Sequence, residues 1–272
     1  MEHKLRLITG ALGIALIGAV YWFFELRGLQ LITFVIAIVS YYEYLQLLLH
    51  PQNTVKLRKL KTASALFFAA LFFLSSQWNF SLVIFVLLLA MLFWLSFAVI
   101  SAAKLPLELT IHDVLIQTFG LLYIFFSLAF LPMIHILPNG VIHILNLILI
   151  IWVGDSFAYY GGKRFGRKKL AALVSPKKTW AGAISGMLGA LVSAIAVKFY
   201  FPLILPLGVW VFITVCVAAI AQIGDLFESL IKRSVHVKDS GKLLPGHGGM
   251  FDRFDSLILA TPFYYFLLTL FS

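Results

Sequence analysis

Residues 224–256 read GDLFESLIKRSVHVKDSGKLLPGHGGMFDRFDS and lie between two strongly apolar segments of the chain. The stretch contains five carboxylates, five Lys or Arg, two His and five glycines. An ionisable side chain at the centre of a membrane helix costs roughly 2.5–3.5 kcal/mol, so ionisable groups at a membrane boundary usually mark a functional site. Charges of both signs in one such stretch are what a metal-bridged phosphate requires.

Outside this stretch the composition is that of a membrane protein. The 272 residues are 62% hydrophobic and 12% charged, whereas charged residues make up about 25% of soluble domains. Apolar runs close to the ~20 residues that cross a bilayer recur along the chain. They predict an all-α, polytopic integral membrane protein with about nine transmembrane helices, at 7–24, 29–50, 63–78, 80–100, 112–134, 141–161, 180–200, 204–225 and 255–271.

The net charge of +10 is distributed as in a membrane protein, and no nucleic-acid partner is expected. Alternate segments between the predicted spans carry 19 Lys or Arg on one side of the membrane and 2 on the other. The positive-inside rule then places the N-terminus and the basic loops in the cytoplasm and the C-terminus outside. The basic excess would also attract anionic lipid headgroups.

The distribution of acidic residues predicts two functional halves. Five acids are scattered singly before residue 150, whereas six acids and thirteen Lys or Arg gather from Asp155 onward. We therefore expect residues 1–140 to form a scaffold of N-terminal transmembrane helices. Residues 141–272 are expected to form the C-terminal helices and cytoplasmic loops that carry the catalytic motifs.

A helical face of polar residues leaves the eighth apolar run. Asp225, Glu228, Ser229 and Lys232 have the spacing i, i+3, i+4 and i+7, which places them on one face of a continuous helix. Arg233 follows directly. The alternative is a set of charges that only ends the helix, with i,i+4 pairing and side chains that reach for water.

A glycine-rich loop precedes the last apolar run. The sequence Gly246-His247-Gly248-Gly249 is followed by Asp252, Arg253 and Asp255. Backbone N–H groups at the start of a helix suit a phosphate, and Asp252 and Asp255 could hold a hard divalent cation such as Mg²⁺. The alternative is a turn with an Asp-rich N-cap.

Two further motifs lie upstream, at the ends of the sixth and seventh spans. Asp155 shares a helical face with Tyr159 and Gly162, although a lone acid can also be a helix–helix hydrogen-bond partner. The sequence 175–180, SPKKTW, is expected to open the seventh span with a helix start at Pro176. Lys177, Lys178 and the Thr179 hydroxyl would then lie at the N-terminus of this helix. The alternative is that the lysines and Trp180 only anchor the helix at the membrane interface.

Three other features have simpler interpretations. The basic run at 163–169 is expected to be a solvated loop that attracts lipid. Gly182 and Gly186 form a GxxxG pattern, which predicts close helix packing. Glu43, near the cytoplasmic end of the second span, is the one other acid that could reach the site, and a plain interfacial position is the alternative.

Together these motifs predict a nucleotidyl- or phosphoryl-transfer centre, because metal-binding carboxylates and phosphate-binding cations share the same cytoplasmic loops. A Walker A sequence, a kinase loop set and a Ser/His/Asp triad are absent from the sequence. An ion-coupled transporter is the main rival of another class, but its polar residues should lie near the bilayer midplane. A related membrane enzyme with another lipid acceptor or phosphoryl donor is the closer rival.

The second half of the chain resembles the phosphatidate cytidylyltransferases, or CDP-diacylglycerol synthases. The resemblance rests on Ser229-x-x-Lys232-Arg233-x4-Lys238-Asp239-Ser240-Gly241, Leu244-Pro245-Gly246-His247-Gly248-Gly249 and Asp252-Arg253-x-Asp255-Ser256. The upstream motifs, at 155–162, 175–180 and 222–229, resemble the same family in the same order. One residue departs from the family pattern, because Ala181 stands where Glu or Gln commonly follows the Trp.

The resemblance implies transfer of CMP from CTP to phosphatidic acid, with Mg²⁺ and in some cases a second cation. Catalytic roles are implied for Asp225, Asp252, Asp255 and Asp155. Of these four acids, Asp225 and Asp252 would bind the metal. Substrate-binding roles are implied for Ser175, Lys177, Lys178, Thr179, Glu228, Ser229, Lys232, Arg233, Lys238, Asp239, His247, Gly248, Gly249 and Arg253. It further implies membrane lipids and a second copy of the chain as partners, and a bacterial cytoplasmic (inner) membrane with the active site facing the cytoplasm.

Overall fold

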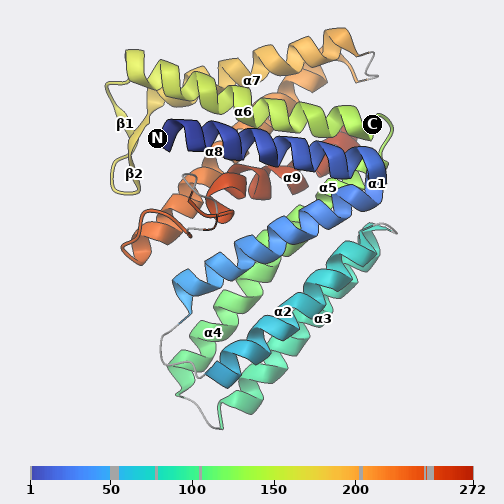
Figure 1. Cartoon of the computed structure of the whole chain (residues 1–272), viewed down its shortest axis with the longest axis vertical. Coiled ribbons are helices and arrows are strands. Elements are labelled where there is room, and N and C mark those ends of the chain that lie inside the picture. Colours follow the sequence, from blue (N-terminus) through green and yellow to red (C-terminus); the bar gives the residue numbers. More distant parts are fainter. Residues whose placement is uncertain are drawn as a thin grey trace. The chain divides into compact units, whose positions relative to one another are not determined.

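The computed structural model is helical apart from one hairpin, and it describes residues 2–49, 55–76, 79–103, 106–201, 205–241, 243 and 248–271. For 2–17 and 55–61 only the backbone is described. The helices are α1 (Glu2–Leu48), α2 (Val55–Ser75), α3 (Phe80–Ser101), α4 (Leu107–Gly120), the π-helix η1 (Leu121–Phe126), α5 (Phe130–Ile136), α6 (Gly140–Phe165), α7 (Trp180–Tyr200), α8 (Leu207–Ser234) and α9 (Phe251–Phe271) (Figure 1).

Seven helices in the described residues are long and apolar enough to cross a membrane, which confirms a helical membrane protein. They are Gly18–Leu48, Phe80–Ser101, Leu107–Ile136, Gly140–Phe165, Trp180–Tyr200, Leu207–Ser234 and Phe251–Phe271. A shorter apolar helix, Thr62–Ser75, overlaps the predicted third span. The predicted first span lies mostly where side chains are not described, so the count of nine and the orientation stay predictions.

The predicted break between the first two spans coincides with a kink in α1. Glu25 has φ 46° and ψ −121°, outside the helical region, and the helix changes direction there (Figure 1). A non-glycine residue seldom adopts a positive φ. The two apolar runs are therefore separate straight segments joined without a loop.

One prediction about local structure is wrong, because no helix begins at Pro176. Instead β1 (Lys169–Ala171) pairs antiparallel with β2 (Ser175–Thr179). A two-stranded hairpin has only edge strands, where proline is tolerated. Helix α7 begins at Trp180, because the Thr179 hydroxyl accepts a hydrogen bond from the Gly182 N–H at 3.1 Å and caps the helix.

The chain forms two compact units. The first comprises Met1–Met133 and Asp239–Phe254, and the second comprises Ile134–Lys238 and Asp255–Ser272. In the first unit the Tyr41 hydroxyl donates to Gln117 Oε1. A Cβ on Gly120 would lie 2.6 Å from the Tyr44 ring, so glycine at this position lets α1 pack directly on α4.

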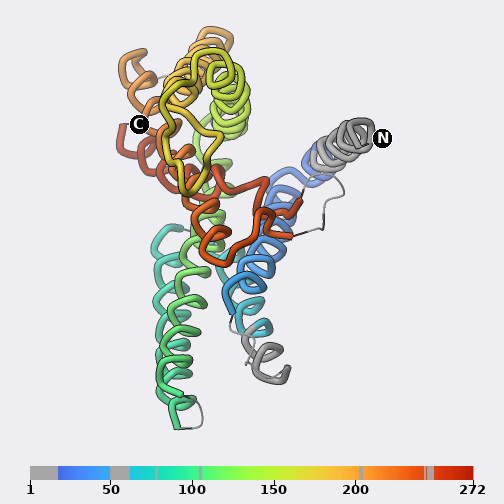
Figure 2. Tube along the Cα trace, turned by 90° about the vertical axis from the view of Figure 1, so that its left-hand side faces the viewer, coloured from blue at the N-terminus to red at the C-terminus, as the bar shows by residue number. Residues whose placement is uncertain are grey.

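The second unit is built on close packing of α6 against α7, which lie side by side in both views (Figures 1 and 2). A Cβ on Gly182 would lie 2.9 Å from the Ala158 carbonyl, and one on Gly186 would lie 3.1 Å from Ala158 Cβ. The predicted packing role of the GxxxG pattern is thus confirmed. Asn146 Nδ2 also donates to the buried Tyr264 hydroxyl at 3.0 Å, which links α6 to α9.

Candidate functional site

Three aspartates from three helices gather in the second unit around one lysine. Asp155 lies on α6, Asp225 on α8 and Asp255 on α9. Asp155 and Asp255 each interact electrostatically with Asp225 and with Lys178. Lys178, on β2, forms an ion pair with Asp225. The structure therefore brings together three of the four predicted catalytic acids and one predicted phosphate-binding cation.

A glycine explains how α9 comes close enough to α8 for this grouping. A Cβ on Gly224 would lie 2.8 Å from the Asp255 carbonyl oxygen, so any side chain there would push the two helices apart. The next residue on α8 is Asp225. The Asp255 carboxylate accepts a hydrogen bond from the Ser256 N–H at 2.6 Å, which fixes the position of its Oδ1.

The hairpin places the lysine. Lys178 is half-buried beside Asp225, while Lys177, the preceding residue of β2, is exposed. Successive residues of a strand point to opposite faces, so only one of the two lysines can turn toward the aspartates. Ser175 begins the same strand and is partly buried. Thr179, predicted to bind substrate, is buried and its hydroxyl caps α7.

The charges of this cluster favour an added cation. Counted as ionised, the three carboxylates and one ammonium carry a net formal charge of −2. Among the described residues, no three His, Cys, Asp or Glu side chains converge closely enough to hold a metal ion by themselves. Mg²⁺ is usually held by one or two carboxylates together with water and substrate phosphates. The carboxylate oxygens are of the ligand type that Mg²⁺ prefers, and a magnesium site here stays a prediction.

The polar face predicted on α8 is confirmed as part of one continuous helix. Glu228 is fully buried, and its Oε2 lies 2.7 Å from the Lys232 ammonium one turn later. Ser229 lies beside this pair and is partly buried. The i,i+4 pairing named as part of the alternative is therefore present, but inside the protein, where a charged pair is retained only if its partners are well placed.

Arg233 joins the hairpin to the end of α8. Its Nε donates to the Val174 carbonyl at 3.4 Å, and its Nη1 donates to the Val237 carbonyl at 2.8 Å. Both acceptors are backbone oxygens, so the guanidinium positions two loops of the second unit. Lys238, the next predicted phosphate ligand, is exposed.

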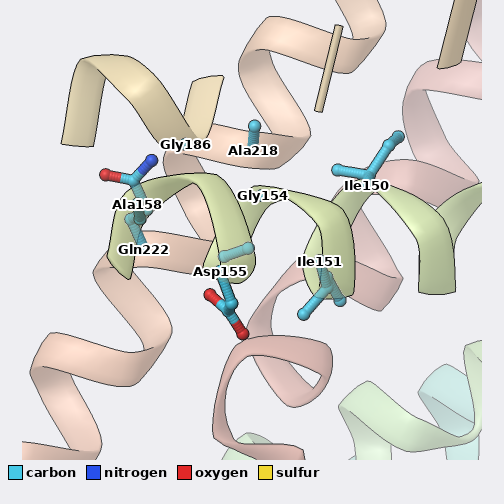
Figure 3. A pocket seen from close by; sticks show the side chains of 9 residues that line it. Ile150, Ile151, Gly154, Asp155, Ala158, Gly186, Ala218 and Gln222 are labelled. Atoms are coloured by element: carbon cyan, nitrogen blue, oxygen red, sulfur yellow. The ribbon is translucent and has the colours of Figure 1, made fainter. Parts of the chain in front are cut away.

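A small pocket borders the aspartate cluster between α6, α7 and α8 (Figure 3). Its volume is about 20 Å³, which is room for a single water molecule. The Asp155 carboxylate and the Gln222 amide point in opposite directions from it (Figure 3), and Gln222 Nε2 donates to the Ala183 carbonyl at 3.1 Å. The pocket is too small for a nucleotide or a lipid headgroup.

The described residues next to and within the glycine loop, 239–241 and 248–252, belong to the first unit, where two carboxylates hold them. Asp252 Oδ2 accepts hydrogen bonds from the Ser240 N–H and the Gly249 N–H, both at 2.9 Å. Glu43 on α1 accepts from the Ser240 hydroxyl at 2.9 Å, the Met250 N–H at 3.1 Å and the Phe251 N–H at 2.9 Å. Asp252 thus connects Ser240 with Gly249, and Glu43 fastens Ser240, Met250 and Phe251 to α1.

Other predicted residues of this loop have varied surroundings. Gly248 has φ 83°, a conformation that favours glycine. Gly249 is buried and its N–H is donated to Asp252, while Asp239 and Arg253 are exposed. His247 lies outside the described residues. The binding roles of these residues stay predictions.

Glu43 is the acid whose position the sequence left undecided. An acid near a predicted span end is compatible with a surface position, yet the side chain is only 6% exposed and accepts three hydrogen bonds. The pairing with Ser240 bridges 197 positions of the chain. The only signal in the sequence was a single acid in an apolar stretch. Such an acid suggests a functional position but does not indicate which residue it contacts.

Comparisons with known proteins agree with the motifs. The sequence model of the cytidylyltransferase family matches residues 4–271. A protein of Rickettsia bellii named phosphatidate cytidylyltransferase is 36% identical over 199 residues, covering 69% of this chain and 84% of the relative. Proteins with the same name from Bacillus subtilis and Haemophilus influenzae are 45% and 42% identical, over 49% and 46% of this chain and 49% and 45% of their own lengths. The chain thus matches about half the length of several of these curated relatives.

Proposed function

The chain belongs to the cytidylyltransferase family, and we propose that it is a membrane-embedded nucleotidyltransferase that transfers CMP from CTP to phosphatidate. The products are CDP-diacylglycerol and pyrophosphate. The observation that carries the proposal is the grouping of Asp155, Asp225 and Asp255 with Lys178. Carboxylates for a metal and a cation for phosphate are the parts that phosphoryl-group chemistry needs.

We propose Mg²⁺ as the cofactor, and a second cation is compatible with the net negative charge of the cluster. Asp225 and Asp252 are the proposed ligands, with Asp155 and Asp255 adding negative charge nearby. When bound, the cation would neutralise charge on the triphosphate and on the departing pyrophosphate. The fit rests on the donor set, since carboxylate oxygens are preferred ligands of Mg²⁺.

The protein's part in the reaction is binding and orientation. A phosphate oxygen of phosphatidate forms a bond to the α-phosphorus of CTP, and the bond from that phosphorus to the bridging oxygen breaks to release pyrophosphate. The phosphate monoester is already ionised near pH 7, because its second pKa is about 6, so no strong general base is required. Lys178 holds one phosphate in place of its pairing with Asp225. Lys177 and Lys238, both exposed, bind other phosphate oxygens.

The proposed setting is a bacterial cytoplasmic membrane with the site facing the cytoplasm. The charge asymmetry of the loops supports this orientation, and the curated relatives are bacterial. CTP would reach the site from the cytoplasm and phosphatidate from the inner leaflet. A homodimer is part of the same proposal.

The direct test is a reconstituted reaction. Purified protein in detergent micelles is given CTP and phosphatidate with Mg²⁺, and both products are measured. We expect CDP-diacylglycerol and pyrophosphate in equal amounts, with both substrates and the cation required. Folded protein that releases no pyrophosphate under these conditions would refute the assignment, and pyrophosphate without lipid product would point to another acceptor.

A further inference from the structure

Glu43 occupies a socket that is built from residues 240–241 and 249–251 of the first unit. Its carboxylate accepts three hydrogen bonds, from the Ser240 hydroxyl, the Met250 N–H and the Phe251 N–H. A Cβ added to Gly241 or to Gly249 would overlap this carboxylate. Both glycines therefore make room for the acid, and every part of the socket belongs to the first unit.

The socket lies at the start of α9. Met250 and Phe251 are the residues at which that helix begins, and their N–H groups are among those that lack a partner inside any helix. A negative charge at a helix N-terminus is stabilised by the helix dipole. Glu43 therefore acts as a cap supplied by a distant helix, and it fixes where α9 begins.

Aromatic contacts hold the same point through the side chain of Phe251. The ring of Phe251 lies 6.2 Å from that of Tyr44, the neighbour of Glu43 on α1, and 6.2 Å from that of Tyr123 on η1. Phe251 is fully buried. The first residue of α9 is thus fixed by its backbone and by its side chain, which leaves little freedom for the helix start.

The position of Asp252 depends on this anchor. Asp252 follows Phe251 directly, and it accepts from the Ser240 N–H, the residue whose hydroxyl donates to Glu43. One serine therefore connects the two carboxylates, with its hydroxyl on Glu43 and its N–H on Asp252. Displacing Glu43 would move the Ser240 N–H, which donates to Asp252, and the start of α9, on which Asp252 lies.

We infer that Glu43 is a positioning residue for the reaction: it holds Ser240 and the start of α9 so that Asp252 stays in place. The inference rests on the proposed function and adds to it a residue from the predicted scaffold half. The rival is a buried cap that contributes only to stability. A misplacement of about 1 Å in a reacting group can cost about 100-fold in rate, so the two roles differ in turnover.

The test compares Glu43→Gln, Glu43→Asp and the control Glu108→Gln, an exposed acid on α4 of the same unit. Gln keeps the shape but loses the charge and turns an NH₂ toward donors, whereas Asp keeps the charge on a shorter stem. We expect kcat of Glu43→Gln to fall about 10- to 100-fold with a much smaller change in KM for CTP. Glu43→Asp should be intermediate, and the control should match the wild type.

A second readout does not need activity. Hydrogen–deuterium exchange of residues 248–254 should become faster in Glu43→Gln and stay unchanged in Glu108→Gln. Unchanged exchange in Glu43→Gln would overturn the anchor, and faster exchange with wild-type kcat would leave only a stability role. If the wild-type protein shows no turnover, both the proposed function and the effect of Glu43 on catalysis are refuted. Hydrogen–deuterium exchange would still decide whether Glu43 holds residues 248–254 in place.

A milder variant covers the case in which Glu43→Gln does not fold. Ser240→Ala removes one of the three hydrogen bonds to Glu43 and keeps the backbone N–H that Asp252 accepts. A hydrogen bond contributes about 0.5–1.5 kcal/mol, which corresponds to a change of about 2- to 10-fold in a rate constant if the whole contribution is lost in the transition state. We expect a fall in kcat of that size, and an unchanged kcat in this variant would contradict the positioning role.

Discussion

Lys178 on β2 and Asp225 on α8 form an ion pair that ties the hairpin of the second unit to its aspartate cluster. The pair is half-buried, so water screens it less than a surface pair. Its position matters more than its strength, because Asp155 and Asp255 interact electrostatically with the same lysine. Lys178 is therefore the cation of this cluster that we propose for a substrate phosphate.

Replacement of Lys178 should weaken nucleotide binding. A charge-assisted hydrogen bond contributes about 1.5–3 kcal/mol, so we expect Lys178→Met to lower kcat/KM for CTP about 10- to 100-fold. Lys169→Met is the matched control, since Lys169 is an exposed lysine on the other strand of the same hairpin. Steady-state kinetics at fixed phosphatidate measure both. Equal effects of the two variants would mean that only the general charge of the hairpin matters.

Replacement of Asp225 should remove turnover and leave a folded protein. Losing a metal ligand removes several kcal/mol of transition-state stabilisation, and each 1.36 kcal/mol is tenfold in rate, so we expect Asp225→Asn to lose more than about 100-fold in kcat. Mg²⁺ should raise the thermal unfolding temperature of the wild-type protein in micelles and raise that of Asp225→Asn less. Equal Mg²⁺ stabilisation of both proteins would contradict the assignment of Asp225 as a ligand.

Removal of the metal gives a reversible version of that test. Dialysis of the wild-type protein against EDTA should abolish product formation, and Mg²⁺ should restore it. The reason is that the net charge of the cluster is negative before substrate binds, so the triphosphate would be repelled without a cation. Full activity after complete metal removal, checked by elemental analysis, would contradict the proposed cofactor.

The sequence predicted best what depends on local periodicity. The membrane helices follow from apolar runs of about 20 residues, and the polar face of α8 follows from the helical period of 3.6 residues. Both features are present in the structure. The hairpin at 169–179 was missed because strands of three and five residues are too short to show alternation, and Pro176 resembled a helix start. The capping Thr before an apolar run was the better signal for the start of α7.

Contacts between distant residues could not be predicted from one sequence. Glu43 and Ser240 are 197 positions apart, and nothing in either neighbourhood specifies the other. The role of Gly224 is similar, since the glycine is meaningful only when the Asp255 carbonyl lies against it. The close approach of two helices depends on tertiary packing. The spacing of residues along one helix does not predict it.

The Thr179 hydroxyl caps α7, and its contact with substrate stays a prediction. Loss of an N-cap costs about 1 kcal/mol, so Thr179→Ala should lower the thermal unfolding temperature by roughly 2–4 °C. Thr179→Ser keeps an acceptor oxygen and should stay close to the wild type. We expect KM for CTP to be unchanged in both variants. A large rise in KM without loss of stability would instead support the predicted contact of Thr179 with substrate.

The contact between Gly224 and Asp255 gives the sharpest test of how the cluster is assembled. In Gly224→Ala the new Cβ would lie 2.8 Å from the Asp255 carbonyl oxygen, which cannot swing away as a side chain could, so α8 and α9 must separate. Overpacking of this kind costs about 1–3 kcal/mol. The control is Gly208→Ala on the same helix, where a Cβ meets nothing within 4 Å. We expect thermal unfolding in micelles to shift down by several degrees in the first variant only, together with a loss of turnover, because Asp255 moves away from Asp225. Equal unfolding temperatures and equal rates in the two variants would mean that the close approach of the two helices is not needed.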